Sequence, residues 1–264
     1  MSDECIHGFQ AGLCATCFPK SIPEAPAVVR AATRPRTVGA PRRASTVRTG
    51  TRGVTGSAPV DDVRQQRVYH LTHISNLASI LADGAVVGGS TPTVSLSPAE
   101  VVADRRATPI PGEPDATLAG FVPFFLSPNA LLWQSIRSHI AHPRASRDIL
   151  AADPADFVLL VANVRELIDS GASFVVTDGV ADAPSTQFGA TPVESDRILR
   201  RLRSEPLQES ILEAELLVRD RLPFEFISLI GVAHDKARAA VREILLGADF
   251  SPKVSVYPPW FASE

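Results

Sequence analysis

Two glutamates separated by a single alanine lie in a stretch that is otherwise entirely apolar. Residues 211–218 read Ile-Leu-Glu-Ala-Glu-Leu-Leu-Val, which predicts a β-strand. Because side chains alternate between the two faces of a strand, Glu213 and Glu215 are expected on the same face. Unpaired carboxylates are costly to bury. This face is therefore either a solvated edge or the wall of a cleft in which negative charge takes part in chemistry.

A second group of reactive side chains lies at the start of the chain. The three cysteines and one histidine there are Cys5, His7, Cys14 and Cys17. Four nitrogen and sulfur ligands are the number that a closed tetrahedral zinc site requires. Zinc binding can contribute on the order of 10 kcal/mol of folding free energy to a segment too short to fold alone. We predict a structural zinc knuckle over residues 1–20, with a redox-active cysteine pair or free thiols as alternatives.

Residues 21–64 have the composition of a disordered linker, rich in Pro, Ala, Thr, Gly and Arg with few large apolar side chains. Seven arginines lie between Arg30 and Arg52 with no acidic residue among them. This charge suits either a loose contact with a polyanion or a solvated tether.

The overall composition is that of an ordinary globular protein. The 264 residues suffice for a full hydrophobic core, and 45% of them are hydrophobic while 21% are charged. No apolar run approaches the roughly 18 residues of a membrane span, and the first residues do not resemble a secretory signal. We expect a cytoplasmic protein with no membrane contact. The formal net charge of −3 argues against a generic nucleic-acid-binding protein.

Residues 65–264 are predicted to form one α+β domain, because strands and helices are mixed without the regular order of a Rossmann sheet. Strands are predicted at 68–73, 121–126, 157–164, 174–177, 211–218, 226–232 and 253–257. Helices are predicted at 75–83, 127–139, 165–170, 193–202 and 235–246. Residues 88–120 are rich in turn formers and are expected to form a long irregular loop.

The first two helices carry the clearest local signals. Ser75 is expected to cap the first helix and Gly84 to end it. Ser127 and Pro128 are expected to open the second. Its predicted buried side comprises Leu131, Leu132, Ile136 and Ile140.

Five stretches follow one another in a recognisable order. They are Tyr69-His70-Leu71-Thr72-His73-x-x-Asn76-Leu77 with Leu81-Ala82-Asp83-Gly84; Phe121-Val122-Pro123-Phe124-Phe125-Leu126; Val176-Thr177-Asp178-Gly179 with Thr186 and Phe188; Glu213-Ala214-Glu215-Leu216-Leu217-Val218; and Val254-x-Val256-x-x-x-Trp260-Phe261. Together they resemble the DarT family, DNA ADP-ribosyltransferases of toxin–antitoxin systems. The resemblance covers residues 68–261 and leaves the predicted knuckle and linker outside.

The resemblance implies an ADP-ribosyltransferase fold, with two facing β-sheets and helices, and NAD as co-substrate in the cleft between the sheets. It also implies transfer of ADP-ribose to thymidine or guanosine in single-stranded DNA. A macrodomain antitoxin that removes the modification would be the natural partner.

By the same resemblance, Glu215 matches the family's catalytic glutamate, whereas Glu213 is either its helper or a solvated carboxylate. The family's NAD-contacting residues match His70, Leu71, Thr72 and, with weaker support, Ser79. Breaking the nicotinamide–ribose bond develops positive charge on the ribose. At 4 Å and an effective dielectric near 20, a carboxylate stabilises a unit positive charge by roughly 4 kcal/mol, or about three decades in rate.

Arg105 and Arg106 lie where the family carries an arginine that contacts NAD and assists proton removal from the base. We assign the catalytic role to Arg106 and NAD binding to Arg105, with an exposed loop pair as the alternative.

The nucleic-acid contacts are less evident in the sequence. Phe124, Phe125 and Trp133 are candidates for stacking on a base, but core packing is the simpler explanation. Phe125 stands where the family usually has tyrosine, and residues 127–133 replace a more polar run that contains arginine. These departures leave room for another acceptor, namely RNA, protein or a small molecule. A different alternative is a non-catalytic module that binds nucleic acid through residues 1–53 and only senses NAD.

Overall fold

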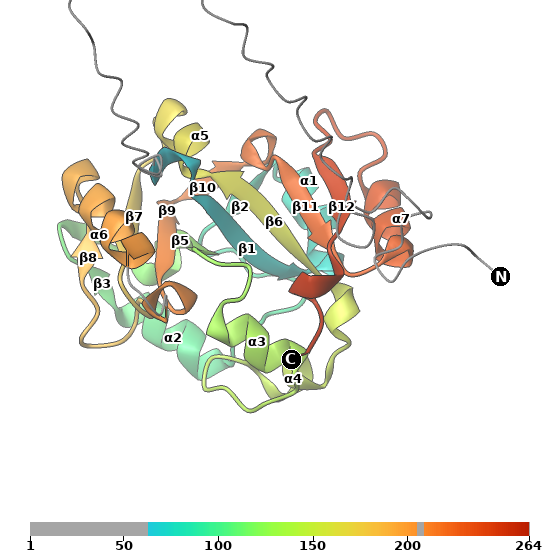
Figure 1. Ribbon diagram of the computed structural model, residues 1–264, viewed down its shortest axis with the longest axis horizontal. Helices are drawn as coiled ribbons and strands as arrows, with labels where there is room; N and C mark the ends of the chain where they lie inside the picture. Colours follow the sequence, from blue (N-terminus) through green and yellow to red (C-terminus); the bar gives the residue numbers. More distant parts are fainter. Residues whose placement is uncertain (1–62, 205–208, 264) are drawn as a thin grey trace, which may run out of the picture. The chain divides into compact units, whose positions relative to one another are not determined.

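The computed structural model describes residues 63–204 and 209–263 (Figure 1). The predicted zinc knuckle and nearly all of the predicted linker lie outside these residues. A 3₁₀ turn, η1 (Val63–Gln65), already buries Val63 in the core, so packing is established before residue 65.

Eight strands form one large sheet in the order β12-β11-β6-β1-β5-β9-β7-β8 (Figure 1). Their bounds, in that order, are Lys253–Val256, Leu229–Val232, Phe157–Asn163, Arg67–His73, Phe121–Phe125, Glu215–Arg219, Phe174–Thr177 and Phe188–Gly189. Neighbours are antiparallel except β11 and β12, which are parallel. In β6, every residue from Phe157 to Ala162 is apolar and buried, as expected for a strand covered on both faces.

The sheet nearly divides where β1 meets β5. Across the described residues, these two strands pair at one position, Tyr69 with Phe125, whereas β1 and β6 pair along their whole lengths. One residue further on, Nδ1 of His70 lies 2.9 Å from the carbonyl oxygen of Pro123, where the backbone ladder would otherwise continue. The expectation of two separate facing sheets is therefore wrong. The two halves belong to one eight-stranded sheet and are joined by a single pair of residues, Tyr69 and Phe125.

Helices and two small sheets complete the described part of the fold. The helices are α1 (Leu77–Ala82), α2 (Ala99–Ala107), α3 (Leu131–Arg137), α4 (Arg147–Ala151), α5 (Val164–Asp169), α6 (Pro192–Ser204) and α7 (Asp235–Ile244). The small sheets pair β2 (Ala85–Val87) with β10 (Arg221–Pro223), and β3 (Pro109–Ile110) with β4 (Glu113–Thr117). No helix in this part of the chain is both long and apolar enough to cross a membrane.

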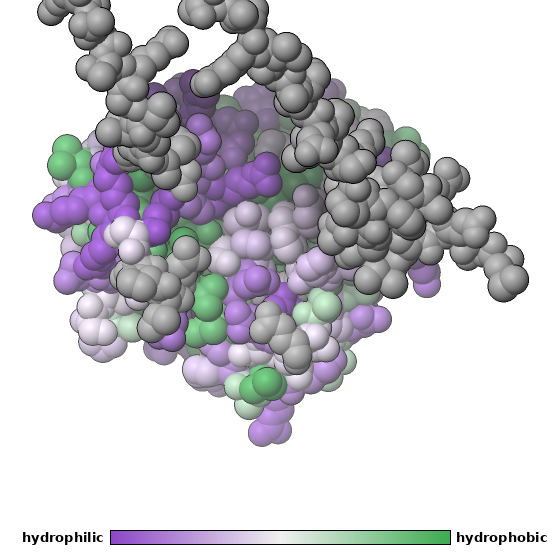
Figure 2. Space-filling model, in the orientation of Figure 1, coloured by the Kyte–Doolittle hydropathy of each residue, from purple (hydrophilic) through white to green (hydrophobic). Residues whose placement is uncertain are grey.

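Alternate residues of β1 and β6 fill two of the three hydrophobic clusters. Val68 and Leu160 belong to the cluster that contains residues of α1, α5, α6 and α7. Their sequence neighbours Tyr69 and Leu159 belong to the cluster that contains residues of α3 and α4. Each fully buried leucine contributes about 1.5–3 kcal/mol. The surface seen in Figure 2 is largely hydrophilic with scattered apolar residues, consistent with this inward packing.

Two predicted helix boundaries are wrong for local reasons. Ser75 lies within η2 (Ile74–Asn76), whose cap is His73; the imidazole Nδ1 accepts a hydrogen bond from the Ser75 N–H. Helix α1 begins only at Leu77, although Gly84 does end it, with a φ of +62°.

The second helix is shorter than predicted at both ends. The Ser127 hydroxyl accepts a hydrogen bond from the Asn129 N–H and forms a turn, so α3 begins at Leu131. It ends at Arg137, and His139 takes a φ of +56°, a left-handed conformation. As a result Ile140 is 61% exposed rather than buried.

Two further segments differ from the prediction. Residues 88–120 contain α2, β3 and β4 instead of irregular structure alone. Helix α2 buries none of its side chains completely, so no amphipathic period marks it in the sequence. The strand predicted for 211–218 starts only at Glu215, because η5 (Ser210–Leu212) precedes it. Likewise β11 starts at Leu229, after η6 (Phe224–Phe226).

Candidate active site

Glu215 is completely buried, and it is the only buried acidic residue in the part of the chain that the structure describes. It is the first residue of β9, and two guanidinium groups face its carboxylate. Arg144 Nη1 lies 2.6 Å from Oε1, and Arg105 Nη1 lies 3.5 Å from Oε2. A buried charge is tolerated when opposite charges surround it in this way.

The neighbouring strand β7 fixes the backbone of Glu215. Thr177, which is fully buried, accepts a hydrogen bond from the Glu215 N–H at its Oγ1, at 3.0 Å. Its hydroxyl proton faces two acceptors, the Gly179 carbonyl at 2.7 Å and the Glu215 carbonyl at 3.2 Å. The Thr-Asp-Gly stretch therefore supports the strand end that carries Glu215.

Strand register places Glu215 beside the point where the sheet divides. Glu215 pairs with Phe125 on β5, and Phe125 pairs with Tyr69 on β1. Glu215 thus lies in the same row of paired residues as Phe125 and Tyr69, where the two halves of the sheet join. His70, which follows Tyr69 in the sequence, is one residue from this row.

The surrounding charges keep Glu215 ionised. Burial by itself raises the pKa of this carboxyl, but the charges of Arg144 and then Arg105 outweigh burial and hold the pKa below its usual value. Burial likewise lowers the pKa of Arg144, while Glu215 and then Asp182 raise it above the ordinary value. At neutral pH the site is a carboxylate between guanidinium ions.

The two consecutive arginines of α2 separate in space. Arg105 reaches Glu215 with a side chain only 11% exposed, and its buried Nη2 has no hydrogen-bond partner within the described part of the chain. Arg106 is exposed. Both border a hollow of about 130 Å³. The structure brings Arg105, rather than Arg106, to the candidate catalytic carboxylate.

Arg144 is the contact that the sequence analysis missed. It lies in the segment between α3 and α4, and its backbone N–H donates to His142 Nδ1 at 3.1 Å. Nothing in the spacing of the sequence links this loop to Glu215, because only the packing of α3 and α4 on the sheet brings them together.

A cavity of about 260 Å³ is lined by residues of β1 and β5, together with α1, β2 and the loop that follows β2. Four of the five residues expected to bind NAD line it, namely His70, Leu71, Thr72 and Ser79, whereas the fifth, Arg105, borders the neighbouring hollow instead. The cavity shares Gly89, Ser90, Val102 and Phe121 with the hollow that contains Arg105. The cavity and the hollow therefore adjoin, and the hollow reaches the arginine that contacts Glu215.

The tautomer of His70 follows from its hydrogen bond. A carbonyl oxygen only accepts, so the ring nitrogen that faces Pro123 O, Nδ1, carries the proton. Burial lowers the pKa of His70, and the hydrogen bond to Pro123 offsets this only in part. The ring is therefore neutral at physiological pH, and its Nε2 is an acceptor.

Glu213 does not share a strand face with Glu215, contrary to the sequence prediction. It precedes β9, caps η5 and is exposed. Its side chain borders a hollow of only about 20 Å³ together with His142 and Arg144. The solvated-carboxylate alternative fits this position.

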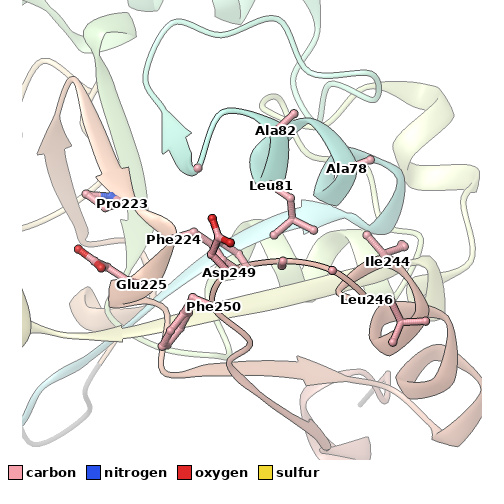
Figure 3. A pocket seen from close by; sticks show the side chains of 13 residues that line it. Ala78, Leu81, Ala82, Pro223, Phe224, Glu225, Ile244, Leu246, Asp249 and Phe250 are labelled. Atoms are coloured by element: carbon pink, nitrogen blue, oxygen red, sulfur yellow. The ribbon is translucent and has the colours of Figure 1, made fainter.

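A roomier pocket, of about 750 Å³, lies on the other side of α1 (Figure 3). Its apolar lining includes Leu81, Phe224 and Phe250, and its charged lining residues are Glu225 and Asp249. None of the predicted site residues borders it. Size alone therefore does not select the candidate site, which rests instead on the charged cluster and on the cavity lined by β1 and β5.

The candidate stacking aromatics are part of the core. Phe124 and Trp133 are fully buried and Phe125 nearly so. Trp133 Nε1 donates to the carbonyl oxygen of Trp260. These rings are not available to a base in this conformation. No cluster of potential metal ligands occurs among the described residues, and the four predicted zinc ligands lie outside them.

Comparison with known proteins relates this chain to a family. Residues 69–262 match the model of the family described as "ssDNA thymidine ADP-ribosyltransferase, DarT". A DNA ADP-ribosyl transferase of Thermus aquaticus is 26% identical over 208 residues, covering 74% of this chain and 88% of the relative.

Two solved structures of the DarT of Thermus sp. 2.9 have a similar fold. The complex with ADP-ribosylated ssDNA has a TM-score of 0.63 at 22% identity, covering 75% of this chain and 96% of that one. The complex with NAD+ has a TM-score of 0.59 at 23% identity, covering 75% of this chain and 98% of that one. Because the family model matches residues 69–262, which are most of the chain, the chain belongs to the DarT family of ADP-ribosyltransferases.

Proposed function

We propose that this protein transfers ADP-ribose from NAD to a thymidine or guanosine base in single-stranded DNA. The observation that carries the proposal is the buried carboxylate of Glu215, held between Arg144 and Arg105, since Arg105 also borders the hollow that adjoins the cavity lined by β1 and β5. The description of the matched family favours thymidine. The DarT structure with ADP-ribosylated ssDNA supports DNA as the acceptor.

The chemistry that this site suits is a displacement at the ribose carbon of NAD. The bond to the nicotinamide nitrogen breaks, and nicotinamide leaves with the electron pair. The ribose then carries positive charge, which the Glu215 carboxylate stabilises. A ring nitrogen of the base forms the new bond and loses its proton to a base in the site or to water. The target base must be unpaired for its nitrogen to reach the ribose.

The residues of the cavity have matching roles in NAD binding. Neutral His70 offers Nε2 to a ribose hydroxyl, while Thr72 and Ser79 offer hydroxyl groups. Leu71 contributes its backbone and an apolar wall, as the family resemblance implies. At about 260 Å³ the cavity is near the lower limit for a ligand site, but it adjoins the hollow next to Arg105.

Binding of the ribose requires one of the two arginines to release Glu215. Arg144 holds its carboxylate oxygen at 2.6 Å, whereas Arg105 is 3.5 Å from the other. Arg105, whose Nη2 has no hydrogen-bond partner within the described residues, is the group more easily redirected to a phosphate or to the base. We therefore assign Arg105 the role next to the reacting atoms and leave Arg106 at the exposed rim as a phosphate contact.

The direct test is mass spectrometry of oligonucleotides incubated with the full-length protein and NAD. Four oligonucleotides, each with one thymidine, guanosine, adenosine or cytidine in an inert context, would identify the base from a gain of one ADP-ribose. Glu215→Gln is the matched control, and RNA and protein pools test the alternative acceptors. Modification of RNA or protein but not DNA, or unchanged DNA modification by Glu215→Gln, would overturn the proposal.

The cellular role as a toxin with a macrodomain antitoxin is part of the same proposal. A base modification that blocks DNA copying would stop growth, and an enzyme that removes ADP-ribose would restore it. Induced expression of the wild type should arrest growth, and expression of Glu215→Gln should not. Equal growth arrest by both would contradict the toxin role.

Residues 1–20 are proposed to hold one zinc ion through Cys5, His7, Cys14 and Cys17. The proposal rests on the four ligands and their spacing. Metal analysis of the purified protein should give one zinc per chain, and Cys14→Ser should lose it. Full retention of zinc by this variant would exclude the four-ligand site.

A further inference from the structure

One wall of the cavity lined by β1 and β5 is a loop. Residues 88–97 follow β2, and all but residue 93 line the cavity. At its start the Gly88 N–H donates to the Asp220 carbonyl at 2.7 Å. Gly88 also lies so close to Gly120 that a Cβ at this position would be 2.6 Å from the Gly120 carbonyl oxygen. Residues 89–93 are exposed, and the next strong attachment is at Val94.

That attachment is made by the buried side chain of Asn76, which is 3% exposed. Its Nδ2 donates to the Val94 carbonyl at 2.9 Å, and its Oδ1 accepts from the Val94 N–H at 2.9 Å. Asn76 therefore holds both backbone groups of Val94, as a neighbouring strand would. Further along, the Leu96 carbonyl accepts from the Ser146 N–H at 3.0 Å, which secures the end of the loop.

The second amide proton of Asn76 goes to the NAD-binding strand. Nδ2 also donates to Thr72 Oγ1, at 3.0 Å. Both amide protons are then used inside the protein, so Asn76 has no donor left for a ligand. The assignment of Nδ2 and Oδ1 follows from Val94, because its N–H must face an acceptor and its carbonyl a donor.

The Asn76 contact determines what Thr72 can offer. A hydroxyl has one proton and two acceptor sites. Since Asn76 occupies an acceptor site, the hydroxyl proton of Thr72 is available for another partner, and no acceptor for it occurs within the described residues. Thr72 lines the cavity. Its hydroxyl therefore has a proton that it can donate to a ligand in the cavity.

We propose that Asn76 is a positioning residue for NAD, which acts without touching the co-substrate. It fastens the loop at Val94 so that the cavity keeps its wall, and it fixes the direction of the Thr72 hydroxyl so that Thr72 donates to an acceptor atom of NAD. The inference rests on the proposed function, because it takes the ligand of this cavity to be NAD.

Asn76→Asp is the sharpest variant, because the two side chains have the same shape. The carboxylate still accepts from the Val94 N–H, but its second oxygen faces the Val94 carbonyl and takes the proton of Thr72. The hydrogen bond that attaches the loop through the Val94 carbonyl is then replaced by a repulsive contact, and the Thr72 hydroxyl donates to residue 76 instead of to a ligand. We expect the Kd and the KM for NAD to rise about tenfold or more, with kcat at saturating NAD changed less than about threefold.

Asn163→Asp is the matched control, since it adds the same negative charge at the start of α5. This variant should leave the KM for NAD within about twofold of wild type. A similar rise in both variants would mean that the added charge repels NAD and would overturn the positioning role.

A double-mutant cycle tests whether Asn76 acts through Thr72. Thr72→Val removes the hydroxyl and keeps the shape. If the hydroxyl direction matters, Asn76→Asp should raise the KM for NAD far less in the Thr72→Val background than in the wild type. Full additivity of the two changes would overturn this part of the inference.

Hydrogen exchange without NAD tests the loop attachment independently of activity. In full-length Asn76→Ala, the amide of Val94, which donates to Asn76 in the wild type, should exchange at least about tenfold faster, while the amides of β6 stay protected. Unchanged exchange in the loop would overturn the anchoring role. If the wild type does not bind NAD, the proposed function fails together with this inference. If the wild type binds NAD and Asn76→Asp leaves the Kd for NAD unchanged, only this inference fails.

Discussion

At the scale of single residues, the site is an electrostatic arrangement around one carboxylate. Glu215 loses all its hydration on folding and is compensated by Arg144 at 2.6 Å and Arg105 at 3.5 Å. Removing one member of such a cluster leaves an uncompensated buried charge, at a cost of about 3–5 kcal/mol. The cluster therefore couples stability to the ionisation needed for catalysis.

This coupling predicts a pH dependence of stability. The folded-state pKa of Glu215 lies below the unfolded value of about 4.3, so the stabilisation is present above that pH and is lost as the pH falls through the folded pKa. Glu215→Gln should lower the free energy of unfolding by a constant amount between pH 7 and 5, and the difference from wild type should shrink below about pH 4. Urea unfolding at several pH values measures it, with exposed Glu225→Gln as control. A difference that persists unchanged to pH 3 would contradict the ionised cluster.

The two arginines of α2 should differ sharply in their importance. Arg105→Met removes a buried contact of Glu215 and should reduce ADP-ribose transfer by about 10²–10³-fold. Arg106→Met changes an exposed side chain and should alter the free energy of unfolding by no more than about 0.5 kcal/mol, with transfer within about fivefold of wild type. Initial rates on an oligonucleotide and urea unfolding measure both. An inactive Arg106→Met beside an active Arg105→Met would reverse the assignment.

At the scale of elements, strand ends position the site. β9 begins at Glu215, β7 ends at Thr177, and β1 and β5 separate beyond Tyr69 and Phe125. Strand register fixes the positions of these strand ends relative to one another. A residue that holds one strand end in place therefore also positions the Glu215 carboxylate. Loops complete the site, with Arg144 on one and the cavity wall at residues 88–97 on another.

Thr177→Val tests this support. The substitution leaves the buried Glu215 N–H without its hydroxyl acceptor, which should cost about 1–3 kcal/mol. Displacement of the carboxylate should lower kcat by about tenfold or more with little change in the KM for NAD. Thr177→Ser should restore most activity, and Ser170→Ala, which removes a hydroxyl at the end of α5, serves as the stability control. A normal kcat in Thr177→Val would show that Glu215 is held by other means.

At the scale of the whole molecule, positive charge is unevenly distributed along the chain. The formal net charge is −3, although seven arginines between Arg30 and Arg52 have no acidic residue among them. A DNA-modifying enzyme with an acidic body gains from a basic segment, because counterion release from phosphates favours binding. We expect the segment to act in DNA capture rather than in chemistry.

Replacing all seven of these arginines by glutamine in the full chain tests this role. The Kd for single-stranded DNA at low salt should rise, and the dependence of log Kd on log salt should become flatter. Because the described site residues lie elsewhere, kcat at saturating DNA should stay within about twofold of wild type. Fluorescence anisotropy over a salt series measures the binding. An unchanged salt dependence would favour a solvated tether.

Much of the fold could be predicted because the strongest signals are local. The unbroken apolar run at 157–162 predicts a buried central strand, and Gly84 ends α1 through its own backbone preference. Helix α2 was not predictable because none of its side chains is fully buried, so no buried stripe of apolar residues marks it. The start of β9 at Glu215 depends on pairing with β5 and β7, which no window of sequence contains.

The sequence by itself determined the residue types of the site and the order of the motifs, hence the family, the candidate glutamate and the strand with His70 and Thr72. Only the tertiary structure decided which charges meet. It brought Arg144 from a distant loop to Glu215, selected Arg105 over Arg106, and separated Glu213 from Glu215. The physical reason is that side-chain alternation and turn preferences act over a few residues. Compensation of a buried charge instead depends on strand register and helix packing across the whole sheet.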